Sequence, residues 1–132
     1  MRKLDSLIAS FNNSITQRKM TFRVPNTSLN YRVVKNFWRL NYLSTVVKDN
    51  FYLVVTHRLD NSGNPIIRNV RSLYNGTGRK YVSVKHGMLE KMVRDRGGNT
   101  LLLTSRGIDG LSWINEAYSD KVGGILLLQI YF

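Results

Sequence analysis

The stretch that decides the fold is the C-terminal end of the chain, 100-TLLLTSRGIDGLSWINEAYSDKVGGILLLQIYF-132. Its apolar segments at 100–104 and 125–131 have the length and composition of buried strands. Between them, the polar and glycine-containing segment 105–110 predicts a loop. Ser112 then predicts the N-cap of a short helix that ends near Tyr118. The pattern is therefore strand, loop, short helix and strand.

The residues before this stretch complete a small domain. Alternation over Arg79–Lys85 predicts a strand. Apolar residues at helical spacing predict a helix over 87–96, which Gly97-Gly98 ends. The only domain boundary that the sequence suggests lies at 72–75, so we predict an N-terminal domain at 1–72 and a C-terminal domain at 73–132.

The first half has the same mixture of elements. Apolar spacing predicts a helix over 4–15, and Pro25-Asn26-Thr27-Ser28 predicts the start of a second helix that runs to about Leu40, with Asn26 or Thr27 as its N-cap. Strands are predicted at 19–24, 43–47, 51–57 and 66–73. The expected fold class is α+β, with two small mixed α/β subdomains, each a short sheet with helices packed on it.

The charge of the chain is strongly one-sided. Lys and Arg number 20 against 8 Asp and Glu, which gives a net charge of +12 over 132 residues. A hydrophobic content of 42% indicates a folded core rather than a disordered basic tail. A folded chain with this excess charge typically binds a polyanion, with nucleic acid as the first candidate and an anionic membrane as the second.

The sequence offers few groups for catalysis. It contains no Cys, and neither His57 nor His86 has metal-ligand spacing around it. The acids are scattered, and apolar runs such as 125–128 are far too short to cross a bilayer. We therefore predict that the protein is not an enzyme and has no cofactor, no metal site, no membrane partner and no small-molecule substrate.

Basic residues concentrate in the first half, where the segment from Met1 to Lys48 has nine of them and a single acid. Such an uncompensated charge favours contact with RNA phosphates over simple solvation. The rings of Tyr31 and Trp38 are assigned to the core. We predict RNA contacts on one face and at the start of the second helix, at Arg32, Lys35, Arg39, Asn26 and Thr27.

Two segments of the second half are also candidates for RNA contact. In the strand at 79–85, the ring of Tyr81 shares a face with basic residues and can stack on an unpaired base; the predicted contacts are Arg79, Lys80, Tyr81 and Ser83. In the loop after the strand at 100–104, hydroxyls and free amides on a tight turn can reach base edges and 2′-OH groups, while an Arg contacts phosphate. The predicted contacts there are Thr104, Ser105, Arg106 and Gly107.

The same loop carries a resemblance to a known family. The motif Leu101-Leu102-Leu103-Thr104-Ser105-Arg106-Gly107-Ile108, followed by a short helix, Val122-Gly123-Gly124 and a last apolar strand, resembles ribosomal protein eight of the small subunit, bacterial type. Gly78-Arg79-Lys80-Tyr81-Val82 looks like the glycine, basic and tyrosine strand of that family, and Gly97-Gly98 falls where its helix also ends in glycine. In the first half, two segments are similar to its opening helix and its proline-led second helix: 7–13 and 24–29.

The resemblance implies a two-domain α+β protein without enzymatic activity. It implies binding to the central domain of small-subunit rRNA, an early role in subunit assembly, and neighbouring small-subunit ribosomal proteins as partners. It assigns Thr104–Gly107 as the principal rRNA contact and Tyr81 with its basic neighbours as a second one. This chain departs from the family at Leu103, where a Ser is usual, at Ile125, where an acid is usual, and by a short insertion after Gly107.

Composition also bears on the location of the protein. Asn occurs 13 times and Ala twice, which is typical of AT-rich organellar genes. We expect a mitochondrial ribosome, in preference to a plastid ribosome or the bacterial cytoplasm. The sequence also leaves two other functions open. The protein could be a regulator outside the ribosome that binds a messenger stem-loop, or an enzyme that acts on RNA.

Overall fold

The computed structural model describes residues 2–73, 81–83, 87–96 and 99–132. These residues form two compact units, one comprising Met1–Val70 with Tyr131–Phe132 and the other comprising Arg71–Ile130. Parts of three predicted features lie outside the described residues: the strand residues Arg79, Lys80, Val84 and Lys85, the side chain at His86, and the helix-ending pair Gly97-Gly98.

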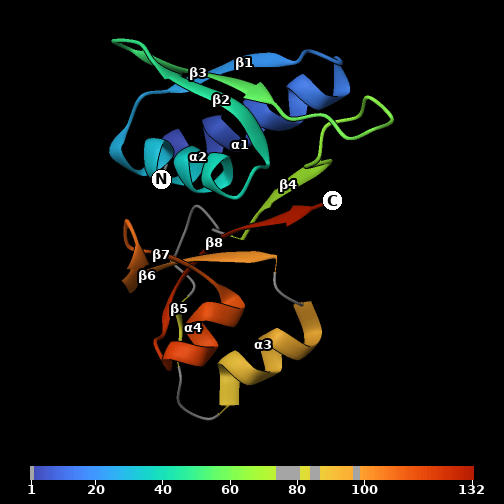
Figure 1. Cartoon of the computed structure of the whole chain (residues 1–132). Coiled ribbons are helices and arrows are strands. Elements are labelled where there is room, and N and C mark those ends of the chain that lie inside the picture. Colours follow the sequence, from blue (N-terminus) through green and yellow to red (C-terminus); the bar gives the residue numbers. More distant parts are fainter. Residues whose placement is uncertain (1, 74–80, 84–86, 97–98) are drawn as a thin grey trace. The chain divides into compact units, whose positions relative to one another are not determined.

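The first unit is a three-stranded antiparallel sheet with two helices (Figure 1). Its strands have the spatial order β1-β3-β2 and its helices α1 and α2 lie on the same side of the sheet. The elements are α1 (Arg2–Thr16), β1 (Thr21–Pro25), α2 (Ser28–Arg39), β2 (Leu43–Lys48) and β3 (Tyr52–His57).

Both helices of this unit form where the sequence predicts them. The side chains of Leu4, Leu7 and Phe11 occupy one face of α1 and are fully buried, as their spacing requires. At the start of α2, the Thr27 hydroxyl accepts a hydrogen bond from the Asn30 amide at 3.2 Å, which confirms Thr27 as the N-cap. The ring of Phe11 packs edge-on against Phe22 of the sheet at 5.1 Å between centroids, so α1 is fixed to β1.

The second unit is built on a five-stranded sheet with the order β4-β8-β6-β7, in which β5 also pairs with β8. The helices α3 and α4 contact each other, and α4 packs on β6. Leu102, Ile114 and Leu126 belong to its buried core. The elements are β4 (Asn69–Ser72), β5 (Tyr81–Val82), α3 (Met88–Arg96), β6 (Thr100–Ile108), β7 (Leu111–Trp113), α4 (Ile114–Asp120) and β8 (Gly124–Tyr131).

The structure differs from the sequence-based prediction in the segment 105–118. The predicted loop at 105–110 is largely strand, because β6 continues to Ile108 and pairs with a short strand, β7, that the sequence did not predict. Ser112 lies within β7 and is therefore not a helix cap. The helix begins two residues later at Ile114, and the Trp113 amide donates to the carboxylate of Glu116 at 3.1 Å.

The predicted strand at 66–73 is also shorter than expected. Only Asn69–Ser72 forms β4. The Ile66 amide instead donates to the Arg58 carbonyl, and Leu59 forms an isolated bridge with Pro65. The residues before β4 therefore belong to a closed loop of the first unit.

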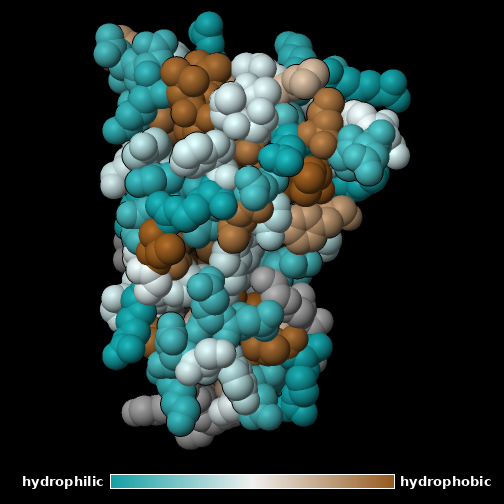
Figure 2. Space-filling model, in the orientation of Figure 1, coloured by the Kyte–Doolittle hydropathy of each residue, from teal (hydrophilic) through white to brown (hydrophobic). Residues whose placement is uncertain are grey.

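The last two residues of the chain belong to the first unit. The Tyr131 carbonyl accepts a hydrogen bond from the Arg68 amide at 2.7 Å, and the ring of Phe132 packs against Tyr42 with 5.0 Å between centroids. On the face drawn in Figure 2, hydrophilic residues predominate and apolar residues form small separate patches. The predicted α+β class, with two subdomains that each pack helices on a short sheet, is confirmed.

Candidate nucleic-acid interface

The loop predicted to contact RNA is a compact bulge in the β6–β7 hairpin. Leu103 and Ile108 both pair with Leu111, so the residues from Thr104 to Gly107 are pushed out of the ladder. The Thr104 amide donates to the Gly110 carbonyl at 2.8 Å, which closes the base of the bulge. The hairpin thus presents four consecutive predicted contact residues together.

The hydroxyl of Thr104 holds the shape of this bulge. It donates to the Arg106 carbonyl at 2.6 Å and accepts from the Arg106 amide at 3.2 Å. It also lies 2.9 Å from the Ser112 hydroxyl. A hydroxyl has one proton and two lone pairs, so these three bonds use its full capacity. Thr104 therefore organises the bulge internally.

Two glycines allow the chain to fold closely around the bulge. Gly107 has φ +83°, and a methyl group there would overlap the carbonyl oxygen of Leu111 and lie 2.5 Å from the Ser112 hydroxyl. At Gly124, the first residue of β8, a methyl group would lie 2.5 Å from the Leu103 carbonyl oxygen and 2.7 Å from Cγ2 of Thr104. Any side chain at either position would displace the bulge.

The other members of the bulge face solvent. Ser105, Arg106 and Gly107 are exposed, whereas Thr104 is half-buried. The bulge thus displays a hydroxyl, a guanidinium and a side-chain-free backbone position on a fixed framework. These are groups that contact base edges, 2′-OH groups and phosphates in RNA complexes.

The second predicted contact of this unit lies near the bulge. Tyr81 pairs with Ile125 of β8, and Ile125 pairs on its other side with Leu103, which directly precedes the bulge. Strands are about 4.8 Å apart, so the main chain at Tyr81 is roughly 10 Å from that at Leu103. Ser83 is half-buried, and Arg79 and Lys80 lie outside the described residues.

In the first unit, positive charge gathers around one ring. The ammonium nitrogens of Lys48 on β2 and Lys35 on α2 lie 4.3 and 5.7 Å from the centroid of the Tyr31 ring. Contrary to the prediction, neither Tyr31 nor Trp38 is a core residue, since Tyr31 is half-buried and Trp38 is 48% exposed. Neither ring is buried, because α2 packs its other face against the unit, with Val33, Val34 and Phe37 buried there.

The remaining predicted residues of this unit have structural contacts of their own. The side-chain amide of Asn26 donates to the Asp49 carbonyl at 3.0 Å, which fixes the β2–β3 turn, while Thr27 caps α2. Arg32 is half-buried, and its Nε reaches the Ser28 carbonyl at 3.4 Å. Arg39, in the last turn of α2, is exposed.

Sequence reasoning missed Ser112, whose hydroxyl supports the bulge from β7. A Ser before a helix normally indicates an N-cap, and no local signal distinguishes that role from a bond to Thr104 across a hairpin. Within the described residues, no group of three or more His, Cys, Asp or Glu side chains is placed to hold a metal ion. None of the helices described is long and apolar enough to cross a membrane.

A comparison with protein-family models decides the relationship. The model for ribosomal protein S8 matches residues 3–131, nearly the whole chain. The chain belongs to the ribosomal protein S8 family. A search of curated proteins finds no match to it.

Membership in the S8 family places the protein in the small ribosomal subunit, where it binds rRNA and neighbouring ribosomal proteins and serves translation. Its role is structural rather than catalytic. The predicted family is thus confirmed over both halves of the chain, including the first half, where the resemblance in sequence was loose.

Proposed function

We propose that this S8-family protein binds the central domain of small-subunit rRNA and supports subunit assembly in a mitochondrial ribosome. The observation that carries the proposal is the bulge at Thr104–Gly107, which projects exposed polar groups from a fixed hairpin. The high Asn and low Ala content supports the mitochondrial assignment.

The geometry supports a division of roles within the bulge. Thr104 and Gly107 set its shape, because the hydroxyl of one is fully used inside the bulge and the backbone of the other needs a glycine. Ser105 and Arg106 make the selective contacts with rRNA, because both residues are exposed. The internal hydrogen bonds of the bulge use only the main-chain atoms of Arg106, so its side chain is available for RNA.

Anchoring is assigned to the basic surface of the first unit. Lys35 and Lys48 gather at Tyr31, and their charge attracts the phosphate backbone without selecting its sequence. Arg32, Arg39, Asn26 and Thr27 extend this contact along α2. Arg79, Lys80, Tyr81 and Ser83 form the proposed second contact in the other unit.

The test compares Ser105→Ala and Arg106→Ala with Lys35→Ala in binding to two RNAs, a central-domain rRNA fragment and an unrelated hairpin of equal length. Each bulge variant is expected to weaken binding to the cognate fragment by about 1–3 kcal/mol and to weaken binding to the hairpin much less. Lys35→Ala is expected to weaken both slightly and to reduce the dependence of affinity on salt.

The outcomes separate the parts of the proposal. Equal effects of all three changes on both RNAs would contradict the division of roles. Tighter binding of the wild type to a messenger stem-loop than to the rRNA fragment would favour a regulator outside the ribosome. Sedimentation of the tagged protein with small subunits from purified mitochondria tests the mitochondrial location. Absence of the protein from the small-subunit fraction would exclude that location.

A further inference from the structure

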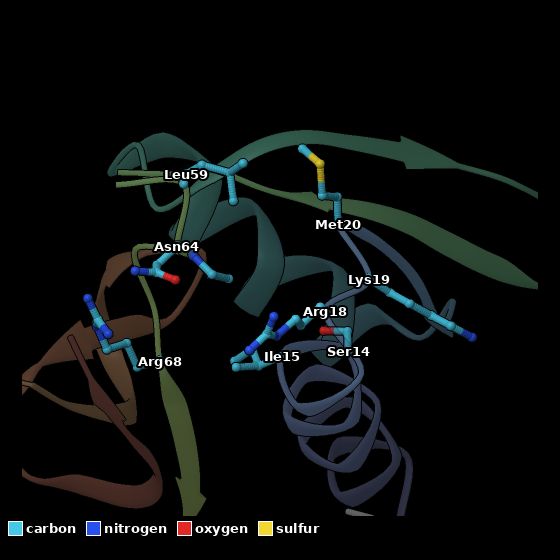
Figure 3. Close-up of a pocket in the computed structure, with 10 residues that line it drawn as sticks. Ser14, Ile15, Arg18, Lys19, Met20, Leu59, Asn64 and Arg68 are labelled. Atoms are coloured by element: carbon cyan, nitrogen blue, oxygen red, sulfur yellow. The ribbon is translucent and has the colours of Figure 1, made fainter. Parts of the chain in front are cut away.

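The first unit contains a pocket that none of the assigned contacts uses. It has a volume of about 510 Å³ and lies between the end of α1 and the closed loop that precedes β4 (Figure 3). Small-molecule sites are typically about 300–1,000 Å³. The pocket is therefore large enough for a nucleotide and larger than a bare anion requires.

The lining of the pocket combines cations with apolar walls. Arg18 enters from the end of α1, and Asn64 and Arg68 line the pocket from the loop opposite. In Figure 3 the guanidinium of Arg68 is turned away from Arg18, and the side chain of Lys19 extends away from the pocket. No acid lines the pocket among the residues described. Four apolar side chains form its remaining walls: Ile15, Met20, Leu59 and Pro65.

The two guanidinium groups differ in their electrostatic surroundings. Arg68 donates to Oδ2 of Asp60 at 3.4 Å, so a carboxylate partly compensates its charge and orients it. Within the described part of the chain, Arg18 has no ion pair. Arg18 therefore provides the stronger positive charge for an incoming anion.

The backbone of Arg18 is the unusual feature of the site. The residue has φ +56°, in the left-handed region. Its amide donates to the Ile15 carbonyl and the Lys19 amide donates to the Ser14 carbonyl, which is the arrangement at a helix C-terminus that glycine normally supplies. Arg18 therefore places a cation, rather than a glycine, beside the pocket at the end of α1.

Both walls of the pocket are held in place before any ligand binds. On one side, Oδ1 of Asp60 accepts hydrogen bonds from the Ser62 and Asn64 amides at 2.9 and 3.0 Å, which closes the loop. On the other side, the buried Ser14 hydroxyl donates to the Phe11 carbonyl at 2.6 Å and lies 2.6 Å from Nε2 of His57. The site is preorganised, which favours binding.

We propose that this pocket binds one unpaired nucleotide. Arg18 binds its phosphate, Arg68 adds positive charge to the opposite wall, the apolar walls contact the faces of the base, and the Asn64 amide provides hydrogen bonds to the base edge. An rRNA strand and a free mononucleotide offer the same chemistry. The inference that this nucleotide belongs to rRNA rests on the proposed function. The inference that the pocket binds a nucleotide does not depend on that function.

The decisive variant is Arg18→Gly, which removes the cation and leaves a residue suited to the left-handed backbone. Its matched control is Lys121→Gly, because Lys121 is also an exposed cation with a left-handed backbone, φ +53°, at the C-terminus of a helix. Both variants are expected to fold at least as stably as the wild type in thermal unfolding. They lose equal charge, and only one of them lies at the pocket.

Two measurements on the full chain test the proposal. In the first, AMP and inorganic phosphate are titrated separately while backbone amide signals are followed by NMR. AMP is expected to shift the signals of residues 14–20 and 59–68 in the wild type and Lys121→Gly but not in Arg18→Gly, at lower concentrations than phosphate. In the second, affinity for the central-domain rRNA fragment is expected to fall about tenfold in Arg18→Gly and at most about twofold in Lys121→Gly.

The results separate this inference from the proposed function. If AMP shifts no signals in these segments, or acts no better than phosphate, the nucleotide pocket is wrong even where the rRNA fragment binds. If AMP binds there but the wild type fails to bind the fragment, the pocket stands and the proposed function fails. If both variants lose equal affinity for the fragment, the nucleotide does not come from rRNA.

Discussion

His57 makes the stability of the first unit depend on pH. Its side chain is 1% exposed and lies against the rings of Phe11 and Phe22, each with 4.9 Å between centroids. The single proton of the Ser14 hydroxyl is donated to the Phe11 carbonyl, so Nε2 of His57 must carry the hydrogen in the 2.6 Å contact with that hydroxyl. Nδ1 is buried and has no hydrogen-bond partner among the described residues.

Protonation of His57 would place a charge and a new N–H group in this apolar site. Burial therefore lowers the pKa of His57 from 6.5 to about 4. The unfolded chain binds this proton near pH 6.5 and the folded chain only near pH 4, so stability is lost as the pH falls through that interval. At 1.36 kcal/mol per pKa unit the full loss is about 3 kcal/mol, of which about 2 kcal/mol is reached by pH 5.

The assay is urea unfolding between pH 7.5 and pH 5 in a Trp113→Phe background, where Trp38 alone reports on the first unit. The control is His57→Phe, which keeps an aromatic ring in the site but cannot titrate there. The free energy of unfolding of the parent is expected to fall by about 2 kcal/mol more than that of the control over this range. Parallel pH dependence in the two proteins would refute the assignment of a neutral, buried imidazole.

Two further predictions concern backbone contacts. Gly107→Ala is expected to destabilise the second unit by about 1–3 kcal/mol in thermal unfolding and to abolish selective rRNA binding, because its methyl group meets the Leu111 carbonyl. The control is Gly87→Ala, because Gly87 has φ +68° and nothing within 4 Å of an added methyl group. An equal loss of stability in Gly87→Ala would exclude the overlap with Leu111 as the cause. Asn12→Ala is expected to lower the stability of the first unit by about 2–3 kcal/mol in urea unfolding, because the Asn12 side-chain amide donates to the Val70 carbonyl at 2.7 Å and accepts from the Val70 amide at 2.9 Å. The control is Asn13→Ala at the exposed neighbouring residue, which should lower stability by less than about 0.5 kcal/mol in the same assay.

The elements that the sequence predicts well are those fixed by local signals. The helix α1 follows from the spacing of Leu4, Leu7 and Phe11, and α2 follows from its Thr27 cap and apolar stripe. The strand β7 was missed because its pairing with β6 depends on a long-range contact, and because Ser112 carries a stronger local signal for a cap than for a strand.

The candidate site shows the same limit. Sequence identified the residues of the bulge, yet the inward role of the Thr104 hydroxyl follows only from its bonds to Arg106 and Ser112. Lys35 lies on α2 and Lys48 on β2, so their contact with the Tyr31 ring depends on how the helix packs against the sheet. The pocket at Arg18 needs a loop far along the sequence, and no periodicity connects such segments.

The return of Tyr131 and Phe132 to the first unit has a consequence for synthesis. Domains generally fold in order as the chain emerges from the ribosome, N-terminal domain first. Here the ring that packs on Tyr42 and the carbonyl that accepts from the Arg68 amide follow the second unit in the sequence. The first unit can therefore reach its final form only after the whole second unit has been translated, although most of its own residues are made first.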